Sequence, residues 1–294
     1  GGDRNKLGAV QGHASEPGTE RWIIVAEYAA PKTVDPELAR DRMLDILAIA
    51  PRVLGVPPEH VHAKTRQRSR GGSQYGKQSA SVRHGGNPQA DATSPQGDVL
   101  IREGGLSFTV NFNDYLDTGI FLDHRITRGL VREHARQART FLNLFAYTGG
   151  ASLAACAAGA DTTHVDSVKQ VVTWARENME LSGLDGIRWI VEDALKFVQR
   201  EVRRGNRYHG IVLDPPAYGR GANGEKWILE DNICEMLECC ARLLEPRGAF
   251  LVLNLYSMGL SSTLARTAVR QAFGAPRTEQ YGELCFTDRA GKQL

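Results

Sequence analysis

From Thr140 onward, short apolar runs alternate with segments of helical pattern, and this alternation constrains the fold most strongly. The candidate strands are 140–145, 162–165, 187–191, 209–213 and 248–254; all have the length of strands, and all except 162–165 (Thr-Thr-His-Val) are mainly apolar. Helices are predicted to begin near Ser152, Ser167, Ala194, Gly224 and Leu260. Strands that alternate with helices form a parallel sheet covered on both faces. The sequence therefore predicts an α/β fold with a doubly wound, mostly parallel sheet.

A smaller α/β region is predicted before this repeat. Residues 21–28 form a strand, a helix follows with Asp35 as its N-cap and Pro36 at its first position, and that helix is expected to end at Pro51. A second strand covers 60–64. Residues 99–112 form a β-hairpin, since Gly104-Gly105 suits a turn that requires positive φ.

These elements predict two domains in a chain of 294 residues. Residues 1–18 are polar and rich in glycine, and we expect a flexible tail. We place the domain boundary near Asn113, so a small domain covers 19–113 and a larger one 114–294. The segment 85–97, rich in Gly, Asn, Pro and Ser, is expected to be a loop.

Composition excludes several classes of protein. Apolar residues make up 41% and charged residues 24% of the chain, as in ordinary soluble globular proteins. The apolar runs are far shorter than the roughly 20 residues of a membrane-spanning helix, and no secretory signal pattern is present. The five cysteines form no CxxC pair and no Cys/His metal spacing. We therefore expect a cytoplasmic protein with reduced thiols, no membrane partner and no metal.

The charge is uneven although the net charge is only +2. Residues 61–90 contain no Asp or Glu, and 64–98 form a basic, Gly-rich loop. The side chains expected to contact RNA phosphates are Lys64, Arg66, Arg68, Arg70 and Lys77. A solvated loop with no nucleic-acid partner would have the same composition, so the stretch alone does not decide between the two.

A glycine-containing turn follows the first predicted strand, and acidic residues lie at the ends of the second and third. Ala146–Gly150 is a Gly-containing turn before a helix, Asp166 ends the second strand, and Asp193 follows the third. A ligand can approach such a turn closely, and a carboxylate there suits ribose hydroxyls. The alternative is that both acids only cap helices. The turn is not GxGxxG and no P-loop lysine follows it, which disfavours a dinucleotide dehydrogenase and a nucleoside-triphosphate site.

The fourth strand ends at Asp214-Pro-Pro-Ala-Tyr218. Two prolines fix the direction of the chain between the carboxylate and the aromatic ring. A ring held there can stack on a base drawn out of RNA while acceptors bind the base edge. The alternative is a proline-rich turn with a core tyrosine.

Five segments together resemble a known family: 27–33 (EYAAPKT), 64–68 (KTRQR), 114–125 (DYLDTGIFLDHR), 143–149 (NLFAYTG) and the DPP at 214–216. They are similar to the SAM-dependent methyltransferases of bacterial large-subunit (23S) rRNA, and most to the guanine-N7 methyltransferase half of the fused methyltransferase K/L. The resemblance covers residues 22 to about 262. Parts of 188–227 depart from that half, and the partner half is absent from this sequence.

The resemblance implies a class I (Rossmann-like) methyltransferase domain that binds S-adenosylmethionine and releases S-adenosylhomocysteine, preceded by a domain that helps to hold rRNA. It implies catalytic roles for Asp214, Pro215, Pro216 and Tyr218. The residues implied in cofactor binding are Phe121, Asp123, Arg125, Asn143, Phe145, Tyr147, Thr148, Gly149, Asp166, Ser167, Asp193, Ala194 and Asp214.

The absence of a cysteine after the fifth strand limits which atom of the substrate can accept the methyl group. Methylation at C5 of a pyrimidine needs a cysteine nucleophile, and residues 253–259 after the fifth strand contain none. Guanine N7 has a free lone pair, and Asn254 or Tyr256 could add contacts to the base edge. Another rRNA nitrogen, a protein or small-molecule substrate, and an RNA-binding assembly module with a vestigial pocket stay open. The oligomeric state is not predicted.

Overall fold

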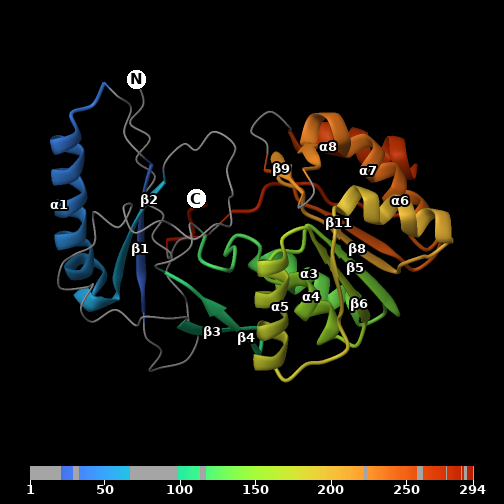
Figure 1. The fold of residues 1–294 in the computed structure, drawn as a ribbon, viewed down its shortest axis with the longest axis horizontal. Helices are drawn as coiled ribbons and strands as arrows, with labels where there is room; N and C mark the ends of the chain where they lie inside the picture. The colour runs from blue at the N-terminus through green and yellow to red at the C-terminus, as the bar shows by residue number, and fades with distance from the viewer. Residues whose placement is uncertain are drawn as a thin grey trace. The chain divides into compact units, whose positions relative to one another are not determined.

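A computed structural model describes residues 21–28, 33–66, 99–112, 117–221, 224–256, 261–275, 277–285, 287 and 290–293 (Figure 1). The chain divides into two compact units. The first contains residues up to Arg102 and the segment Thr109–Ile120, and the second contains Glu103–Phe108 and Phe121–Leu294. Compact packing does not establish independent folding, so the predicted domain boundary near Asn113 stays a prediction.

In the first unit, strand β1 (Ile23–Tyr28) pairs in parallel with β2 (Val61–Arg66), and helix α1 (Pro36–Leu54) connects them through the short 3-10 helix η1 (Pro58–His60). Asp35 caps α1 as predicted, accepting a hydrogen bond from the Glu37 amide at 2.9 Å. The predicted end at Pro51 is wrong. The helix continues to Leu54, because its last turn closes through the Pro51 carbonyl onto the amide of left-handed Gly55.

The predicted hairpin is present as β3 (Val99–Glu103) and β4 (Leu106–Val110). Gly104 and Gly105 both have positive φ, 59° and 80°. Positive φ at both central residues defines the type I′ turn, which matches the twist of a hairpin. The turn and its flanking residues pack with the second unit.

The second unit is built on a five-stranded parallel sheet in the order β11-β8-β5-β6-β7. Its strands are, in chain order, β5 (Thr140–Leu144), β6 (Asp161–Asp166), β7 (Arg188–Val191), β8 (Gly210–Leu213) and β11 (Phe250–Leu253). Helix α3 (Arg125–Ala135) precedes β5, and the helices between and after the strands are α4 (Gly150–Cys156), α5 (Lys169–Leu181), α6 (Ala194–Arg204), α7 (Leu229–Leu243) and α8 (Ser262–Phe273). The predicted α/β class and all five predicted strands are confirmed.

Alternate residues of the central strands enter two separate cores, one on each face of the sheet. Leu142 and Leu144 pack with side chains of α6 and α7, whereas Phe141 packs with α3 and α4. Helices therefore cover both faces (Figure 1). Within the described part of the chain, no helix is long and apolar enough to cross a membrane.

Two elements differ from the prediction. Helix α3 was not predicted, because the segment leading into it is polar and lacks a clear periodicity. A helix was predicted to begin near Gly224, but the chain forms a small antiparallel hairpin there, β9 (Tyr218–Arg220) and β10 (Lys226–Ile228). The helix α7 begins only at Leu229, after the hairpin.

Candidate functional site: the carboxyl edge of the parallel sheet

The strand order places the predicted site residues at one edge of the sheet. From β5 the chain adds β6 and β7 on one side, and then β8 and β11 on the other. All five strands are parallel, so their carboxyl ends lie at the same edge, and the order reverses between β5 and β8. Ligands of open α/β sheets bind outside such a reversal. Asp166 lies at the end of β6, and Asp193 and Asp214 follow the ends of β7 and β8.

The turn after β5 has an unusual backbone. Phe145 and Tyr147 adopt positive φ, 55° and 48°, although neither is glycine. Such conformations are costly for residues with a side chain and persist only where neighbours hold them. Asp166 supplies one restraint, because its Oδ2 accepts a hydrogen bond from the Tyr147 amide at 2.9 Å. The turn is therefore preformed at the start of α4.

Gly149, the N-cap residue of α4, has φ 87°. A Cβ atom at this position would lie 3.0 Å from the Ala175 Cβ and 3.1 Å from Leu153 Cδ1. The main chain here packs closely on helix α5. The neighbouring Thr148 is buried, and its carbonyl accepts a hydrogen bond from the Asn178 side-chain amide at 3.0 Å.

Asn143 lies beneath the turn rather than in an open crevice. Its side chain is 2% exposed, and its Nδ2 donates to Ser152 Oγ at 2.9 Å. Ser152 Oγ in turn lies 3.0 Å from Nδ1 of His164. Burial lowers the pKa of His164 to about 3, so this histidine is neutral. The arrangement joins β5, α4 and β6, and it gives Asn143 a positioning role.

Asp166 and Asp193 both hold the start of a helix. Asp166 Oδ1 accepts from the Val168 amide at 2.9 Å, and Asp193 Oδ1 accepts from the Lys196 amide at 3.0 Å. Burial raises the pKa of Asp166, and hydrogen bonds from backbone amides oppose this shift. The capping alternative is thus observed for Asp193, whereas Asp166 binds the amide of Val168, the residue before α5, and is not its N-cap. Neither hydrogen bond excludes ligand binding, because a carboxylate oxygen has two lone pairs.

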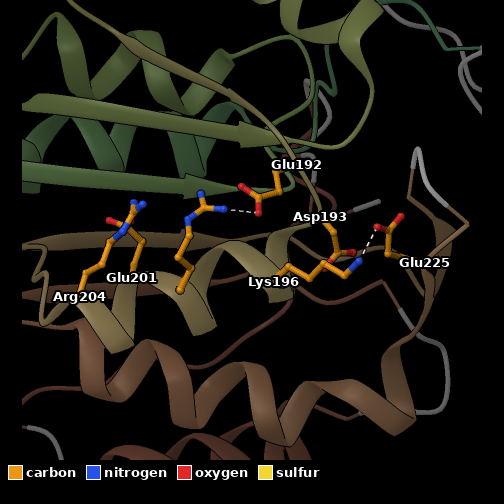
Figure 2. Close-up of polar contacts among 7 residues, drawn as sticks. Glu192, Asp193, Lys196, Glu201, Arg204 and Glu225 are labelled. Atoms are coloured by element: carbon orange, nitrogen blue, oxygen red, sulfur yellow. Dashed lines mark hydrogen bonds and ion pairs between the residues drawn. The ribbon is translucent and has the colours of Figure 1, made fainter.

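Figure 2 shows the surroundings of Asp193 at the start of α6. On one side Glu192 forms an ion pair with Arg200, and on the other Lys196 pairs with Glu225 at 2.7 Å. The predicted cofactor residue Ala194 is the first residue of α6 and is buried, whereas Ser167 lies between β6 and α5 and is partly exposed.

The Asp214 carboxyl group also has a strongly shifted pKa. Burial, and next the charge of Asp123, raise its pKa to about 7, although Arg128 opposes the shift. Its Oδ1 is buried and has no hydrogen-bond partner in the described part of the chain. Its Oδ2 lies 3.4 Å from Nδ1 of His124. A buried acceptor without a partner is costly unless a ligand completes it.

His124 was not predicted as a site residue, although it lies within the motif at 114–125. It is 7% exposed, and its ring stacks on that of Tyr256 with centroids 5.4 Å apart and planes at 4°. Its Nε2 contacts the Tyr256 hydroxyl, and its Nδ1 lies 3.3 Å from Asn254 Nδ2. Burial lowers the pKa of His124, so the ring is neutral and offers one donor and one acceptor.

The three predicted cofactor residues around the start of α3, Phe121, Asp123 and Arg125, lie in different surroundings. The Phe121 ring lies 5.1 Å from the Tyr147 ring, and Asp123 lies 4.0 Å from His124 Nε2. Arg125 is the first residue of α3 and its side chain is exposed. The guanidinium of buried Arg128, which was not predicted, binds both oxygens of Glu103 at 2.6 and 2.9 Å and donates to the Phe121 carbonyl at 2.8 Å.

The segment after Asp214 is held by Trp227. Its indole Nε1 donates to the Pro216 carbonyl at 2.7 Å, and its ring packs 4.8 Å from that of Phe145. Pro215 is buried, whereas Tyr218 is 42% exposed. Tyr218 is therefore not a core tyrosine, and the alternative of a simple proline-rich turn with a buried ring is wrong.

Lys64 does not fit the predicted RNA-binding set. It is 3% exposed, and its ammonium group donates to the Asn111 carbonyl at 3.2 Å within the first unit. The charge is needed to satisfy buried acceptors, so it is not presented to a phosphate. Arg66 lies in β2, but its side chain is outside the described residues, as are Arg68, Arg70 and Lys77.

The edge fits a nucleoside cofactor with a charged group. The turn is preformed, and Gly149, which has no Cβ, lets a ligand approach its main chain closely. The acids at successive strand ends, including the Asp214 oxygen that has no partner among the described residues, supply hydrogen-bond acceptors for such a ligand. Among the described residues, no cluster of His, Cys, Asp and Glu has the geometry of a metal site.

Curated relatives share much of this sequence. The "Ribosomal RNA large subunit methyltransferase K/L" of Methylococcus capsulatus is 41% identical over 240 residues, which are 80% of this chain and 30% of the relative. The protein of the same name from Allochromatium vinosum is 38% identical over 242 residues. The chain thus spans about 30% of the length of these relatives. The sequence motifs predicted this resemblance correctly.

Solved structures agree with the fold. An SAM-dependent methyltransferase from Agrobacterium tumefaciens is 39% identical, covers 61% of this chain and 60% of its own, and superposes with a TM-score of 0.58. SMU.776, a methyltransferase complexed with SAH, is 23% identical and has a TM-score of 0.65 over 87% of this chain and 61% of its own. This second likeness supports the class I fold alone. The family model described as S-adenosylmethionine-dependent methyltransferase matches residues 42–282, which confirms the predicted cofactor and enzyme class. The chain therefore belongs to the S-adenosylmethionine-dependent methyltransferase family.

Proposed function

We propose that this methyltransferase transfers a methyl group to N7 of a guanine in 23S rRNA. The curated relatives that carry an rRNA methyltransferase name support the substrate class, and the chain corresponds to about 30% of their length. The observation that carries the proposal is the half-buried Asp214 carboxyl group after β8, whose buried Oδ1 has no partner among the described residues, near the exposed Tyr218.

The chemistry of guanine suits this carboxyl group. N7 has a lone pair and needs no base, so catalysis is mainly orientation and electrostatics. The two oxygens of ionised Asp214 accept from guanine N1–H and the exocyclic amine. The same negative charge offsets the positive charge that forms on the purine as N7 is methylated. Tyr218 stacks on the ring, as aromatic side chains do on unpaired bases.

We assign cofactor binding to the turn after β5 and the adjoining strand ends. When bound, S-adenosylmethionine supplies an activated methyl group on its sulfonium. The main chain of Phe145–Gly149 lines the methionine and ribose, with Asn143 holding the turn from below. Asp166 and Ser167 bind the ribose hydroxyls, and Asp193 and Ala194 the adenine. Phe121, Asp123 and Arg125 close over the same ligand.

Pyrimidine C5 methylation is not favoured at this site. That reaction needs a thiolate near the base, and the described residues after β11, Asn254 to Tyr256, include no cysteine. Cys240 lies on α7, fully buried, and burial raises its pKa well above the ordinary range. A buried neutral thiol does not act as a nucleophile.

The test is radiolabel transfer from S-adenosylmethionine to protein-free 23S rRNA that has not been methylated, followed by mass mapping of the product. We expect label in 7-methylguanine and a loss of about 10²-fold or more in kcat for Asp214→Asn, because an amide cannot offset the charge on the purine. Label on an exocyclic amine would shift the assignment to another rRNA nitrogen. Label on protein or small molecules only would overturn the rRNA proposal, and no binding of S-adenosylmethionine by calorimetry would favour a non-catalytic RNA-binding module.

A further inference from the structure

We propose that one face of the β9–β10 hairpin binds the RNA backbone beside the target base, an inference that rests on the proposed function. The cross-strand register pairs Lys226 with Arg220, and Ile228 with Tyr218. Directly opposed residues of an antiparallel pair project to the same face, and so do residues two apart in one strand. Tyr218, Arg220 and Lys226 therefore share a face. All three are exposed.

The opposite face attaches the hairpin to the sheet. Trp227, which pairs with Gly219, is 4% exposed and packs against Phe145 in the turn after β5. The Trp227 indole binds the Pro216 carbonyl, and the Leu229 amide donates to the Ala217 carbonyl at 3.0 Å. The exposed face is thus held in register with Asp214, which precedes β9 by only a few residues.

The two cations on this face have no acidic partner among the residues that the structure describes. Within the described part of the chain, neither Arg220 nor Lys226 forms an ion pair, whereas Lys196, Arg200 and Arg204 all do. Glu225 precedes Lys226 directly, yet its carboxylate is turned to Lys196 at 2.7 Å (Figure 2). Gly221 permits this, since a Cβ there would collide with the Glu225 carboxylate.

The three side chains match the chemistry of a single-stranded RNA segment. Arg220 Nε donates to the Tyr218 hydroxyl at 3.0 Å, which fixes the guanidinium and leaves its two Nη groups for a phosphate. Lys226, opposite it, adds a second charge, and the Tyr218 ring offers a stacking surface. Aromatic rings interleaved with cations are the usual means of binding single strands. The target base at Asp214 and the phosphates flanking it are then bound by one rigid segment.

The test is the salt dependence of binding to a short single-stranded oligoribonucleotide that contains guanine. Each phosphate neutralised in a single strand contributes about 0.7 to the slope of log K against log salt. We expect the double variant Arg220→Gln with Lys226→Gln to have a slope shallower by about 1.4, with binding of S-adenosylmethionine unchanged by calorimetry. Unchanged cofactor binding shows that the variant is folded.

The matched control is Arg203→Gln with Arg247→Gln. Both arginines are exposed, but one ends α6 and the other precedes β11, at the edge of the sheet where the strands begin. Their removal is expected to leave the slope as in the wild type. A hairpin variant with the wild-type slope, or a control variant with an equal loss, would overturn the inference. The rRNA methylation assay is independent of this binding measurement. If the enzyme methylates rRNA but the hairpin variant binds RNA with the wild-type salt slope, the proposed contact is refuted and the proposed function is not affected.

Discussion

The ionised Asp214 carboxylate destabilises the folded protein, and replacing it with the neutral amide of asparagine would remove this cost. The folded protein keeps a proton on this carboxyl up to about pH 7, whereas an unfolded chain releases it near the ordinary value of 3.8. Between these values the folded state binds more protons, so the contribution of Asp214 to stability falls as the pH rises and the penalty is complete above about pH 7. We expect Asp214→Asn to stabilise the protein at about pH 8 by roughly 1–3 kcal/mol while it abolishes most activity.

Denaturant unfolding at about pH 5 and about pH 8 measures this effect, because the stabilisation should be larger at the higher pH. Asp161→Asn is the control, since Asp161 is exposed at the start of β6 and should change stability by less than about 0.5 kcal/mol at either pH. Equal stability of Asp214→Asn and wild type at both values would show that the carboxyl group is not strained by its burial.

His124 orients the Asp214 carboxylate. Nδ1 lies 3.4 Å from Asp214 Oδ2 and 3.3 Å from Asn254 Nδ2, and Nε2 contacts the Tyr256 hydroxyl. When Asp214 is ionised, we expect the tautomer with its proton on Nδ1, because that proton faces the carboxylate. We expect His124→Phe, which retains a ring for stacking on Tyr256, to lower kcat by about tenfold to a hundredfold without changing the affinity for S-adenosylmethionine. If the imidazole donates to the carboxylate, its loss raises the pKa of Asp214, so the acid limb of the kcat profile is expected to move to higher pH.

The control for this variant is His134→Phe in the last turn of α3, the helix that His124 precedes, where the side chain is exposed. It should leave both kcat and the pH profile unchanged. A His124→Phe enzyme with reduced kcat but an unshifted acid limb would mean that His124 only fills space beside Tyr256.

At the scale of elements, the sequence pattern predicted those strands and turns whose conformation depends on residues close together in the chain. Most strands of the large sheet are apolar runs, and the β3–β4 turn has two glycines, so both were predictable; β6 is mainly polar and was predicted from its place in the alternation of strands and helices. The β9–β10 hairpin was not, because its strands have three residues each and are held by Trp227 packing on a distant turn. Likewise, Asp166 and Asp214 lie at the ends of predicted strands, whereas His124 contacts Tyr256 across 132 residues, a contact that no local pattern indicates.

The turn after β5 shows how an element depends on a single backbone position. Gly149→Ala should destabilise the protein by about 2–4 kcal/mol, because φ of 87° is strained for alanine and the new Cβ would press on Ala175 and Leu153. Gly159→Ala is a matched control, with φ of 96° and no atom within 4 Å of the added Cβ. It carries the backbone strain alone, so a smaller loss of roughly 1–2 kcal/mol is expected.

Thermal unfolding compares the stabilities of the two glycine variants, and calorimetry compares their cofactor affinities. Only Gly149→Ala should weaken binding of S-adenosylmethionine, since only that turn is assigned to the cofactor. If both variants lost the same stability and neither lost affinity for S-adenosylmethionine, the close packing of the turn on α5 would not be required for cofactor binding.

At the scale of the whole molecule, the segment Glu103–Phe108 determines where the second unit can begin. It packs with Phe121–Leu294 although the chain between belongs to the first unit. Glu103 binds the guanidinium of Arg128, which is 7% exposed, and Ser107 exchanges hydrogen bonds of 3.0 Å with Ser182, the C-cap residue of α5. A fragment that starts at Phe121 leaves the Arg128 charge buried without its partner.

We therefore expect a fragment starting at Val99 to fold and bind S-adenosylmethionine, and one starting at Phe121 to be less stable by roughly 3–5 kcal/mol. Denaturant unfolding and calorimetry of both fragments measure this difference. Glu103→Gln in the longer fragment isolates the cause, because it retains the hairpin and the serine bonds and removes only the charge. If that variant were as stable as its parent, the hairpin would stabilise the unit through packing, and the ion pair would not set its boundary.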